Sequence, residues 1–370
     1  MCTTRHYVPI LRWKQAEKLA LHRLRIDDKI KMTPLIELTP APFLPKRREA
    51  STDDDNKSKL LVVTDPTPDP GSVLRRHAKE VLRFWGYSPF FLEVRHLEGT
   101  VPLINGKTHC LAFFAELARN YRLKLVPVTG LNPSITHQSA IAEALNSDNN
   151  GLCLRVNVAE LLDKGFANRS ANSLKTFGTS IANSDLLIDY GVFNAEATGI
   201  FDLISMVPDV ASWRSVIVAQ GAFPKDLQGF KPGAHRIERS DWKTWVSGLA
   251  ACGELRWPSF SDYTIQYGQY VEPVENANPS ASIRYTLENE WLIMRGEGIF
   301  NEDGPGRAQW NANAILLTER DEFYGANFCD GDTYIAEMSR DKKNHGSPMT
   351  WIRAGLNHHM SVVLQQIGAL

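Results

Sequence analysis

Short apolar runs alternate with amphipathic helical patterns along most of the chain. Eight apolar runs, each the length of one strand, are separated by segments whose apolar residues recur every three or four positions. The clearest helical stripe begins at Cys110 and continues through Phe114 and Ala118 to Tyr121. The predicted strands cover residues 7–14, 33–38, 90–95, 124–129, 152–158, 185–190, 216–220 and 261–267.

This alternation predicts an α/β protein built as a (β/α)8 barrel of the TIM type. Strands of this number, separated by helical segments over roughly 260 residues, match the length and the order of that fold. An open, doubly wound sheet is the alternative. Its glycine fingerprint is absent after the first strand, which continues directly into Arg12, Trp13 and Lys14, so the barrel is favoured.

Two segments depart from the alternation. Residues 41–70 are rich in Pro, Asp and Lys, which predicts an exposed insertion with a short strand at 60–63. Later in the chain, 283–294 and 314–323 are predicted to form a long β-hairpin or a small sheet. The predicted organisation has three parts, a barrel, a β-rich insertion and a helix that closes the barrel, over residues 1–279, 280–340 and 341–370. An independent small C-terminal domain is the alternative.

Composition and charge exclude several classes of protein. Lysine and arginine number 41 against 42 aspartate and glutamate residues, a net charge of −1 that argues against binding to bulk nucleic acid. No run of about 18 apolar residues occurs and no apolar leader is visible, so we expect no membrane association. The five cysteines are scattered without a Cys-x-x-Cys pair, which favours reduced thiols in a cytoplasmic protein.

Charged side chains fall late in almost every predicted strand. Because a parallel barrel gathers the carboxyl ends of its strands into one mouth, we expect these residues to meet there. The candidate ligand-binding residues are Arg12, Lys14, Arg95, Arg155, Gln220 and Gln266. The candidate catalytic residues are Glu37, Glu93, Asp189 and Asp262. At strand ends, Arg12 and Asp189 are expected to be within reach of water or substrate.

Cations beside carboxylates indicate a ligand with an anionic group. Arginine binds phosphate or carboxylate through two parallel hydrogen bonds, and carboxylates serve as general acids and bases or as ligands of Mg²⁺. We therefore predict an anionic small molecule or nucleotide at the mouth, with Mg²⁺ as a candidate cofactor. Whether the chain is an enzyme, such as a phosphodiesterase or another hydrolase, is left open. A buried salt-bridge network that only fills the mouth is the alternative.

His358 and His359 are adjacent in the last predicted helix. Neighbouring side chains on a helix point about 100° apart and rarely bind one metal ion. We interpret both histidines as hydrogen-bonded residues of the core.

Several segments resemble the beta family protein group of bacteria and phages. Residues 7–17, with the sequence YVPILRWKQAE, and residues 34–37, with the sequence PLIE, are similar to the start of that group. Residues 260–266, with the sequence FSDYTIQ, look like its later Gly-Asp-Tyr strand, although Ser261 stands where the group usually has Gly. Its C-terminal signature resembles residues 325–332 and 351–359.

The resemblance implies family-pattern positions without roles, and a phage or phage-defence context. These positions are Arg12, Lys14, Glu17, Glu37, Asp262, Asp332, Arg353 and His359. A second class of function therefore stays open beside ligand processing. In it, the chain is a non-catalytic component of a defence or phage system and contacts a protein partner through the 41–70 insertion and the C-terminal β segment.

The composition of residues 41–70 generates a first prediction. A segment rich in Pro, Asp and Lys buries little apolar area and is expected to be open to proteases. Limited proteolysis of the folded protein should therefore cut first within this segment, as mapped by mass spectrometry of the earliest fragments. First cuts elsewhere, with this segment protected in the monomer, would contradict the prediction.

Overall fold

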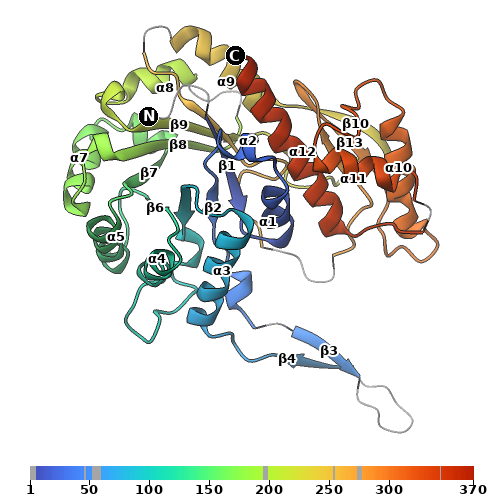
Figure 1. The fold of residues 1–370 in the computed structure, drawn as a ribbon, viewed down its shortest axis with the longest axis horizontal. Helices are drawn as coiled ribbons and strands as arrows, with labels where there is room; N and C mark the ends of the chain where they lie inside the picture. Colours follow the sequence, from blue (N-terminus) through green and yellow to red (C-terminus); the bar gives the residue numbers. More distant parts are fainter. Residues whose placement is uncertain are drawn as a thin grey trace.

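Eight parallel strands close into a barrel (Figure 1). The computed structural model describes residues 6–45, 47–51, 60–194, 199–252, 255–272, 277–341 and 343–370. The barrel strands, in their order around the ring, are β1 (Tyr7–Arg12), β11 (Ser259–Asp262), β9 (Ser215–Gly221), β8 (Ser184–Val192), β7 (Leu152–Asn157), β6 (Leu125–Thr129), β5 (Phe90–Glu93) and β2 (Leu35–Glu37). Because β1 pairs with both β2 and β11, the ring is closed. The predicted (β/α)8 barrel is confirmed, and the open sheet is excluded.

The register of the strands places late polar residues side by side. Arg12 of β1 is the Cα partner of Glu37 on β2, and Glu37 is in turn the partner of Glu93 on β5. Farther around the ring, Asn157 of β7 is the partner of Asp189 on β8. Partnered residues of parallel strands point to the same face of the sheet, so Arg12, Glu37 and Glu93 form one row at the carboxyl end of the barrel.

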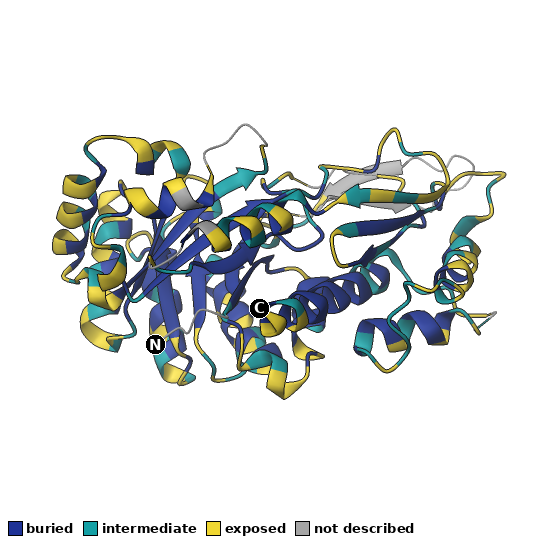
Figure 2. Cartoon of the chain, turned by 90° about the horizontal axis from the view of Figure 1, so that it is seen from above, coloured by how far each residue is buried: buried dark blue, intermediate teal, exposed yellow. Residues whose placement is uncertain are grey.

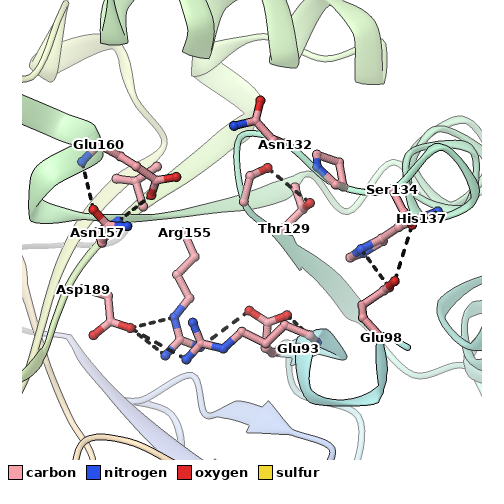
Figure 3. Close-up of a pocket in the computed structure, with 14 residues that line it drawn as sticks. Glu93, Glu98, Thr129, Asn132, Ser134, His137, Arg155, Asn157, Glu160 and Asp189 are labelled. Carbon is pink, nitrogen blue, oxygen red and sulfur yellow. Dashed lines mark hydrogen bonds and ion pairs between the residues drawn. The ribbon is translucent and has the colours of Figure 1, made fainter. Parts of the chain in front are cut away.

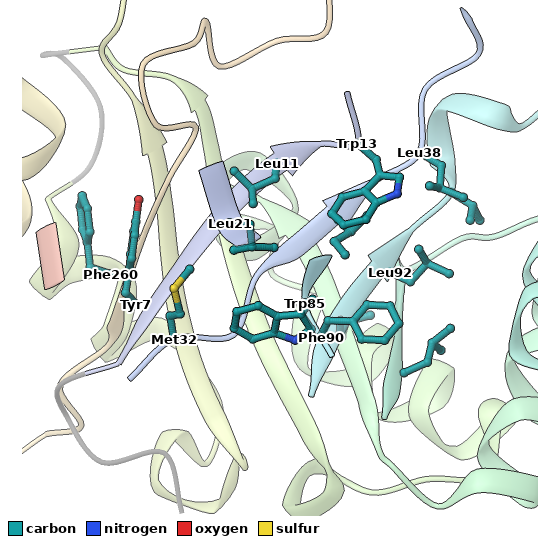
Figure 4. Close-up of a cluster of buried hydrophobic side chains, with 14 of the residues drawn as sticks. Tyr7, Leu11, Trp13, Leu21, Met32, Leu38, Trp85, Phe90, Leu92 and Phe260 are labelled. Atoms are coloured by element: carbon teal, nitrogen blue, oxygen red, sulfur yellow. The ribbon is translucent and has the colours of Figure 1, made fainter. Parts of the chain in front are cut away.

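Helices cover the outer face of the barrel. The longer ones are α1 (Gln15–His22), α3 (Pro70–Phe84), α4 (Cys110–Asn120), α5 (Ile135–Asp148), α7 (Phe166–Phe177), α8 (Ile200–Met206), α9 (Ser240–Cys252) and α12 (Pro348–Ala369), and the shorter ones are α2 (Ile26–Lys29) and α6 (Val158–Leu162). Figure 4 shows Leu11 and Leu92 of the strands in one apolar cluster with Leu21 of α1 and Trp85 at the end of α3. Within the described residues, no helix has the length and apolar character needed to cross a membrane.

The insertion at 41–70 contains a short 3₁₀ helix, η1 (Ala41–Phe43), and a β-hairpin. The hairpin strands β3 (Arg47–Ser51) and β4 (Leu60–Thr64) are antiparallel and extend away from the barrel (Figure 1). The strand predicted at 60–63 is thus present as β4. Residue 46 and residues 52–59 lie outside the described residues, so the predicted exposure of the whole insertion stays a prediction.

A second lobe lies beside the barrel and has its own hydrophobic core. Its antiparallel sheet has the order β10 (Gly233–Glu238), β13 (Glu290–Arg295) and β12 (Ile283–Thr286). Two helices, α10 (Gln309–Thr318) and α11 (Asp330–Met338), complete it. Because β10 comes from between β9 and α9, the sheet draws on the barrel segment as well as on the predicted insertion.

The strand predicted at 314–323 is wrong, because residues 314–318 belong to α10 and the remaining residues follow this helix. The hairpin lies within 283–295 instead, where β12 turns back into β13. Trp310, Ala314 and Leu317 are all buried, and their spacing of four and three residues suits a helix. Periodicity alone does not separate a short apolar strand from a buried helical segment.

Helix α12 joins the lobe to the barrel and packs against α1 and β1 (Figure 1). Figure 2 shows that this helix is buried along most of its length. His359 Nε2 lies 2.8 Å from Asp262 Oδ2 of β11, and His358 Nδ1 lies 2.7 Å from Asp332 Oδ2 of α11. Both histidines are fully buried, as expected for hydrogen-bonded core residues.

The close approach of α12 to β12 generates a second prediction. A Cβ atom at Gly355 would lie 2.7 Å from the carbonyl oxygen of Arg284, which is backbone and cannot move aside. Gly355→Ala is therefore expected to destabilise the protein by about 1–3 kcal/mol, measured by chemical denaturation. Gly368→Ala in the same helix is the control, because nothing lies within 4 Å of its added Cβ. Equal stability of the two variants would contradict this account of the packing.

Candidate functional site

Arg155 of β7 lies at the centre of the barrel mouth among carboxylates (Figure 3). Its Nε and Nη2 donate to Asp189 Oδ2 at 3.0 and 2.8 Å, and its Nη1 donates to Glu37 Oε1 at 2.8 Å. Glu93 Oε2 lies 3.5 Å from the same Nη1. All four side chains are buried. Residues from four strands therefore form one buried ion network.

Tyr263, directly after β11, extends the network toward the last strand of the barrel. Its hydroxyl donates to Asp189 at 2.8 Å and accepts a hydrogen bond from Arg155 Nη2 at 2.9 Å. The backbone N–H of Gly191 donates to Asp189 Oδ1 at 2.8 Å. Asp189 thus receives hydrogen bonds from three directions, which fixes its position.

Arg12 forms the second half of the mouth. Its Nη2 donates to the carbonyl oxygen of Tyr267 at 2.7 Å, and its Nη1 donates to Gln266 Oε1 at 3.4 Å. Its Nε lies 3.8 Å from Glu37 Oε2. The amide of Gln266 in turn donates to Glu17 Oε1 at 2.8 Å. Arg12 and Gln266 therefore hold the segment after β11 against β1 and β2.

Burial and charge act in opposite directions on the carboxylates of the mouth. Burial alone would raise the pKa of Glu37, but the charge of Arg155, with contributions from His96 and Arg95, holds that pKa far below its usual range. Glu93 behaves differently, because burial raises its pKa and Arg155 offsets only part of the effect. Glu37 is therefore a permanent anion at neutral pH, whereas Glu93 is the carboxylate of the pair that more readily binds a proton.

A pocket of about 440 Å³ opens beside the network (Figure 3). Glu93, Arg155 and Asp189 of the network line it, together with Arg95 of the 3₁₀ helix η2 (Arg95–Leu97). Of the Arg95 side chain, 44% is exposed, whereas only 3% of Arg155 is exposed. The remaining lining residues are Glu98, Thr129, Gly130, Asn132, Pro133, Ser134, His137, Val156, Asn157 and Glu160.

The structure separates three predicted site residues from this mouth. Lys14 is exposed at the start of α1 and lines another hollow of about 790 Å³ with Trp13 and Lys18. Gln220 is buried on the outer face of β9, where it alternates with residues of the barrel interior. Asp262 also points outward, where it accepts hydrogen bonds from Tyr7 and pairs with the histidine of α12.

These differences have simple physical causes. β1 ends at Arg12, so the alternation of faces no longer applies two residues later at Lys14. Alternation shows which residues share a face, but it does not show which face lines the barrel. Arg12 and Asp189 are only 7% and 9% exposed, but Asp189 lines the pocket, so the expectation that water or substrate reaches these two residues stays a prediction. Their charges are satisfied inside the protein.

Tyr263, Glu98 and His137 are among the residues of the mouth that were missed in the sequence. Tyr263 lies within the predicted strand at 261–267, on the face opposite Asp262, which is a signal that alternation offers. Glu98 and His137 line the pocket from the loop after η2 and the first turn of α5. Their signal is weaker, because it consists only of polar residues in the segments that follow two strands.

The fold and the site define a parallel α/β barrel with a buried charged network and a pocket at the carboxyl ends of its strands, where sites of this fold lie. A family model described as Beta protein matches residues 7–365. The chain belongs to the Beta protein family. No curated protein matches it.

Apart from the exposed Lys14, the positions that carry the family resemblance fall into two groups in the structure. One group lies at the mouth and consists of Arg12, Glu17 and Glu37. The other group fastens α12 and consists of Asp262, Asp332, Arg353 and His359. The first group therefore belongs to the candidate site, and the second holds the two lobes together.

The ion network generates a third prediction. Arg155→Met leaves Glu37 and Asp189 buried without the cation that both of them contact at 2.8 Å, which is expected to destabilise the protein by about 3–5 kcal/mol at pH 7. In the wild type, the lowered pKa of Glu37 stabilises the fold above the ordinary value of a glutamate, and this contribution is lost as the pH falls. In the variant, burial raises the pKa of the stranded carboxylates, so its deficit should shrink from pH 7 to pH 5.

Urea denaturation of both proteins at the two pH values measures this deficit. Lys14→Met is the matched control, because it removes an exposed cation outside the network and should change the free energy of unfolding little. If Arg155→Met loses no more free energy of unfolding than Lys14→Met, the network does not stabilise the barrel. The same holds if the loss does not change with pH.

Proposed function

We propose that the mouth pocket binds a phosphorylated ligand, such as a nucleotide or the end of a nucleic acid, and that Arg95 contacts its phosphate. The observation that carries the proposal is the exposure of this arginine at the side of the pocket. One of its nitrogens, Nη2, donates to Glu37 at 3.1 Å, which orients the guanidinium and leaves other N–H groups for a ligand. The charge of Arg155, by contrast, is already balanced by carboxylates.

The start of α5 supports the same ligand chemistry. Asn132, Pro133 and Ser134 line the pocket immediately before this 14-residue helix, and Ser134 is its N-cap. The first N–H groups of a helix have no acceptor within the helix, and the helix dipole favours an anion at that end. Barrel proteins commonly bind phosphate at helix N-termini of this kind.

Glu93 supplies acid–base chemistry in the proposed function. Its carboxylate lines the pocket, and burial raises its pKa above the usual value of a glutamate, which favours proton uptake. In hydrolysis of a phosphodiester, the oxygen of a water molecule bonds to phosphorus and its proton passes to Glu93. The bond to the leaving oxygen breaks with its electron pair, and that oxygen takes the proton back from Glu93, which regenerates the carboxylate.

The second candidate function is a non-catalytic, protein-binding role in the phage or phage-defence setting that the family resemblance implies. It is favoured by the β3–β4 hairpin, which extends away from the barrel (Figure 1). The pairing of Arg155 with Glu37 and Asp189 suits either role, because a buried network also stabilises a scaffold.

The phosphate contact generates a fourth prediction. Arg95→Ala is expected to weaken the binding of inorganic phosphate and of nucleoside monophosphates by about 10- to 100-fold, since a hydrogen bond to a charged group contributes about 1.5–3 kcal/mol. Arg95→Lys keeps the charge but loses the planar fork, so its affinity should lie between those of the wild type and Arg95→Ala. Isothermal titration calorimetry measures all three.

Arg75→Ala is the control for this experiment. It removes a half-exposed arginine of α3, outside the mouth pocket, and should bind phosphate as the wild type does. Wild-type protein that binds none of these ligands, or Arg95→Ala that binds them equally well, would contradict the proposal and favour the protein-binding role.

A further inference from the structure

Glu98, His109 and His137 come together from three separate segments beside the mouth. Glu98 follows η2, His109 is the N-cap of α4, and His137 lies in the first turn of α5. His109 Nε2 lies 2.8 Å from Glu98 Oε1, and His137 Nδ1 lies 3.3 Å from the same oxygen. The two imidazole rings are stacked, with their centroids 4.8 Å apart.

The cluster is buried on one side and open on the other. Both histidines are buried, whereas 35% of the Glu98 side chain is exposed. Glu98 and His137 line the mouth pocket (Figure 3), and Glu98 and His109 line a neighbouring hollow. Among the described residues, the buried Nε2 of His137 has no hydrogen-bond partner. The Nδ1 of the same ring faces Glu98, so a metal ion bound at Nδ1 would leave the free Nε2 to carry the ring proton.

We propose that Glu98, His109 and His137 bind one divalent transition-metal ion of the Zn²⁺ class. Two imidazoles and one carboxylate are a ligand set of catalytic zinc sites. One ligand atom of each residue lies within 4.8 Å of the other two, and tetrahedral bonds of about 2.1 Å place such atoms about 3.4 Å apart. Mg²⁺ prefers oxygen ligands, so the two imidazoles favour an ion of the zinc class.

The protonation of the histidines is compatible with metal binding. Burial, together with the neighbouring His109, lowers the pKa of His137 to about 4, so this ring is neutral at pH 7. The N–H of Leu111 donates to His109 Nδ1 at 3.2 Å, so Nε2 carries the ring proton and faces Glu98. When the ion binds Nε2, this proton moves to Nδ1, and one capping hydrogen bond is exchanged for a metal–nitrogen bond.

A second cluster of metal-ligating residues differs from the first in its exposure and in its hydrogen bonding. Cys329, Asp332 and His358 are fully enclosed, and their polar atoms already have partners. Asp332 accepts hydrogen bonds from Tyr285 and Cys329, and His358 Nε2 faces the carbonyl oxygen of Thr286. The cluster at Glu98 is therefore the one that is open to a metal ion.

Three protein ligands leave one coordination position for water or for a ligand in the pocket. The metal site does not rest on the proposed phosphate ligand, because its binding of an ion is measured without any phosphate present. A negative result for phosphate binding would therefore not contradict the metal site. A negative result for metal binding would likewise not contradict phosphate binding.

Co²⁺ is the probe for this proposal, because its visible absorption reports the geometry of the site and the type of ligand. The full chain, freed of metal with a chelator and titrated with CoCl₂, is expected to bind one equivalent with the strong visible bands of a four- or five-coordinate ion. Added Zn²⁺ should displace it. Glu98→Gln and His137→Gln are each expected to weaken Co²⁺ binding by at least about 100-fold.

His22→Gln is the control, because it removes an exposed histidine of α1 and should bind Co²⁺ as the wild type does. Circular dichroism checks that each variant is folded, and Glu98→Gln keeps the test valid if His137→Gln fails to fold. Absence of stoichiometric binding, or equal binding by wild type and Glu98→Gln, would overturn the proposal. A thiolate-to-cobalt charge-transfer band would place the ion on a cysteine, outside the proposed set of ligands, and would also overturn it.

Discussion

The carboxyl end of the barrel depends on charge neutrality around Arg155. Register and alternation bring Glu37, Glu93 and Asp189 to the same level inside the mouth, where water does not screen their repulsion. A buried carboxylate without a cation is costly, so the guanidinium of Arg155 is a condition for this arrangement. The same network fastens the segment after β11, because Tyr263 donates to Asp189. One cation thus links strands on different sides of the ring.

The same constraint recurs where α12 joins the barrel to the second lobe. Burial opposes the ionisation of Asp262 and Asp332, but a histidine beside each one lowers its pKa below the usual value. Both ring nitrogens of His358 face oxygen atoms, Asp332 Oδ2 at 2.7 Å and the carbonyl oxygen of Thr286 at 2.8 Å, so the ring is held on both sides. Two histidine–carboxylate hydrogen bonds therefore set the position of α12 more specifically than apolar contacts alone, since each bond has one favourable geometry.

The order of strands and helices was predictable because a parallel strand is buried on both faces and forms a continuous apolar run. The prediction failed at 314–323, because the helix α10, which packs within the second lobe, carries an apolar run similar to that of a buried strand. It also failed to place Gln220 and Asp262, because in their strands the outer face is as buried as the inner one. The approach of His109 to His137 depends on how α4 packs against α5. No local pattern records a contact between residues so far apart in the chain.

The charge of the pocket lining decides which ligand it can hold. Its carboxylates, from Glu93, Glu98, Glu160 and Asp189, outnumber its guanidinium groups, from Arg95 and Arg155. The pocket lining therefore carries a net negative charge, which repels a phosphate dianion. The exposed Arg95 balances this negative charge only in part. Burial raises the pKa of Glu93, and proton uptake there removes one negative charge. An ion of the zinc class at Glu98 would add two positive charges on the side of the pocket near α5. The two proposals are tested separately, yet they are complementary, since an anion is held best where cations face it from two sides.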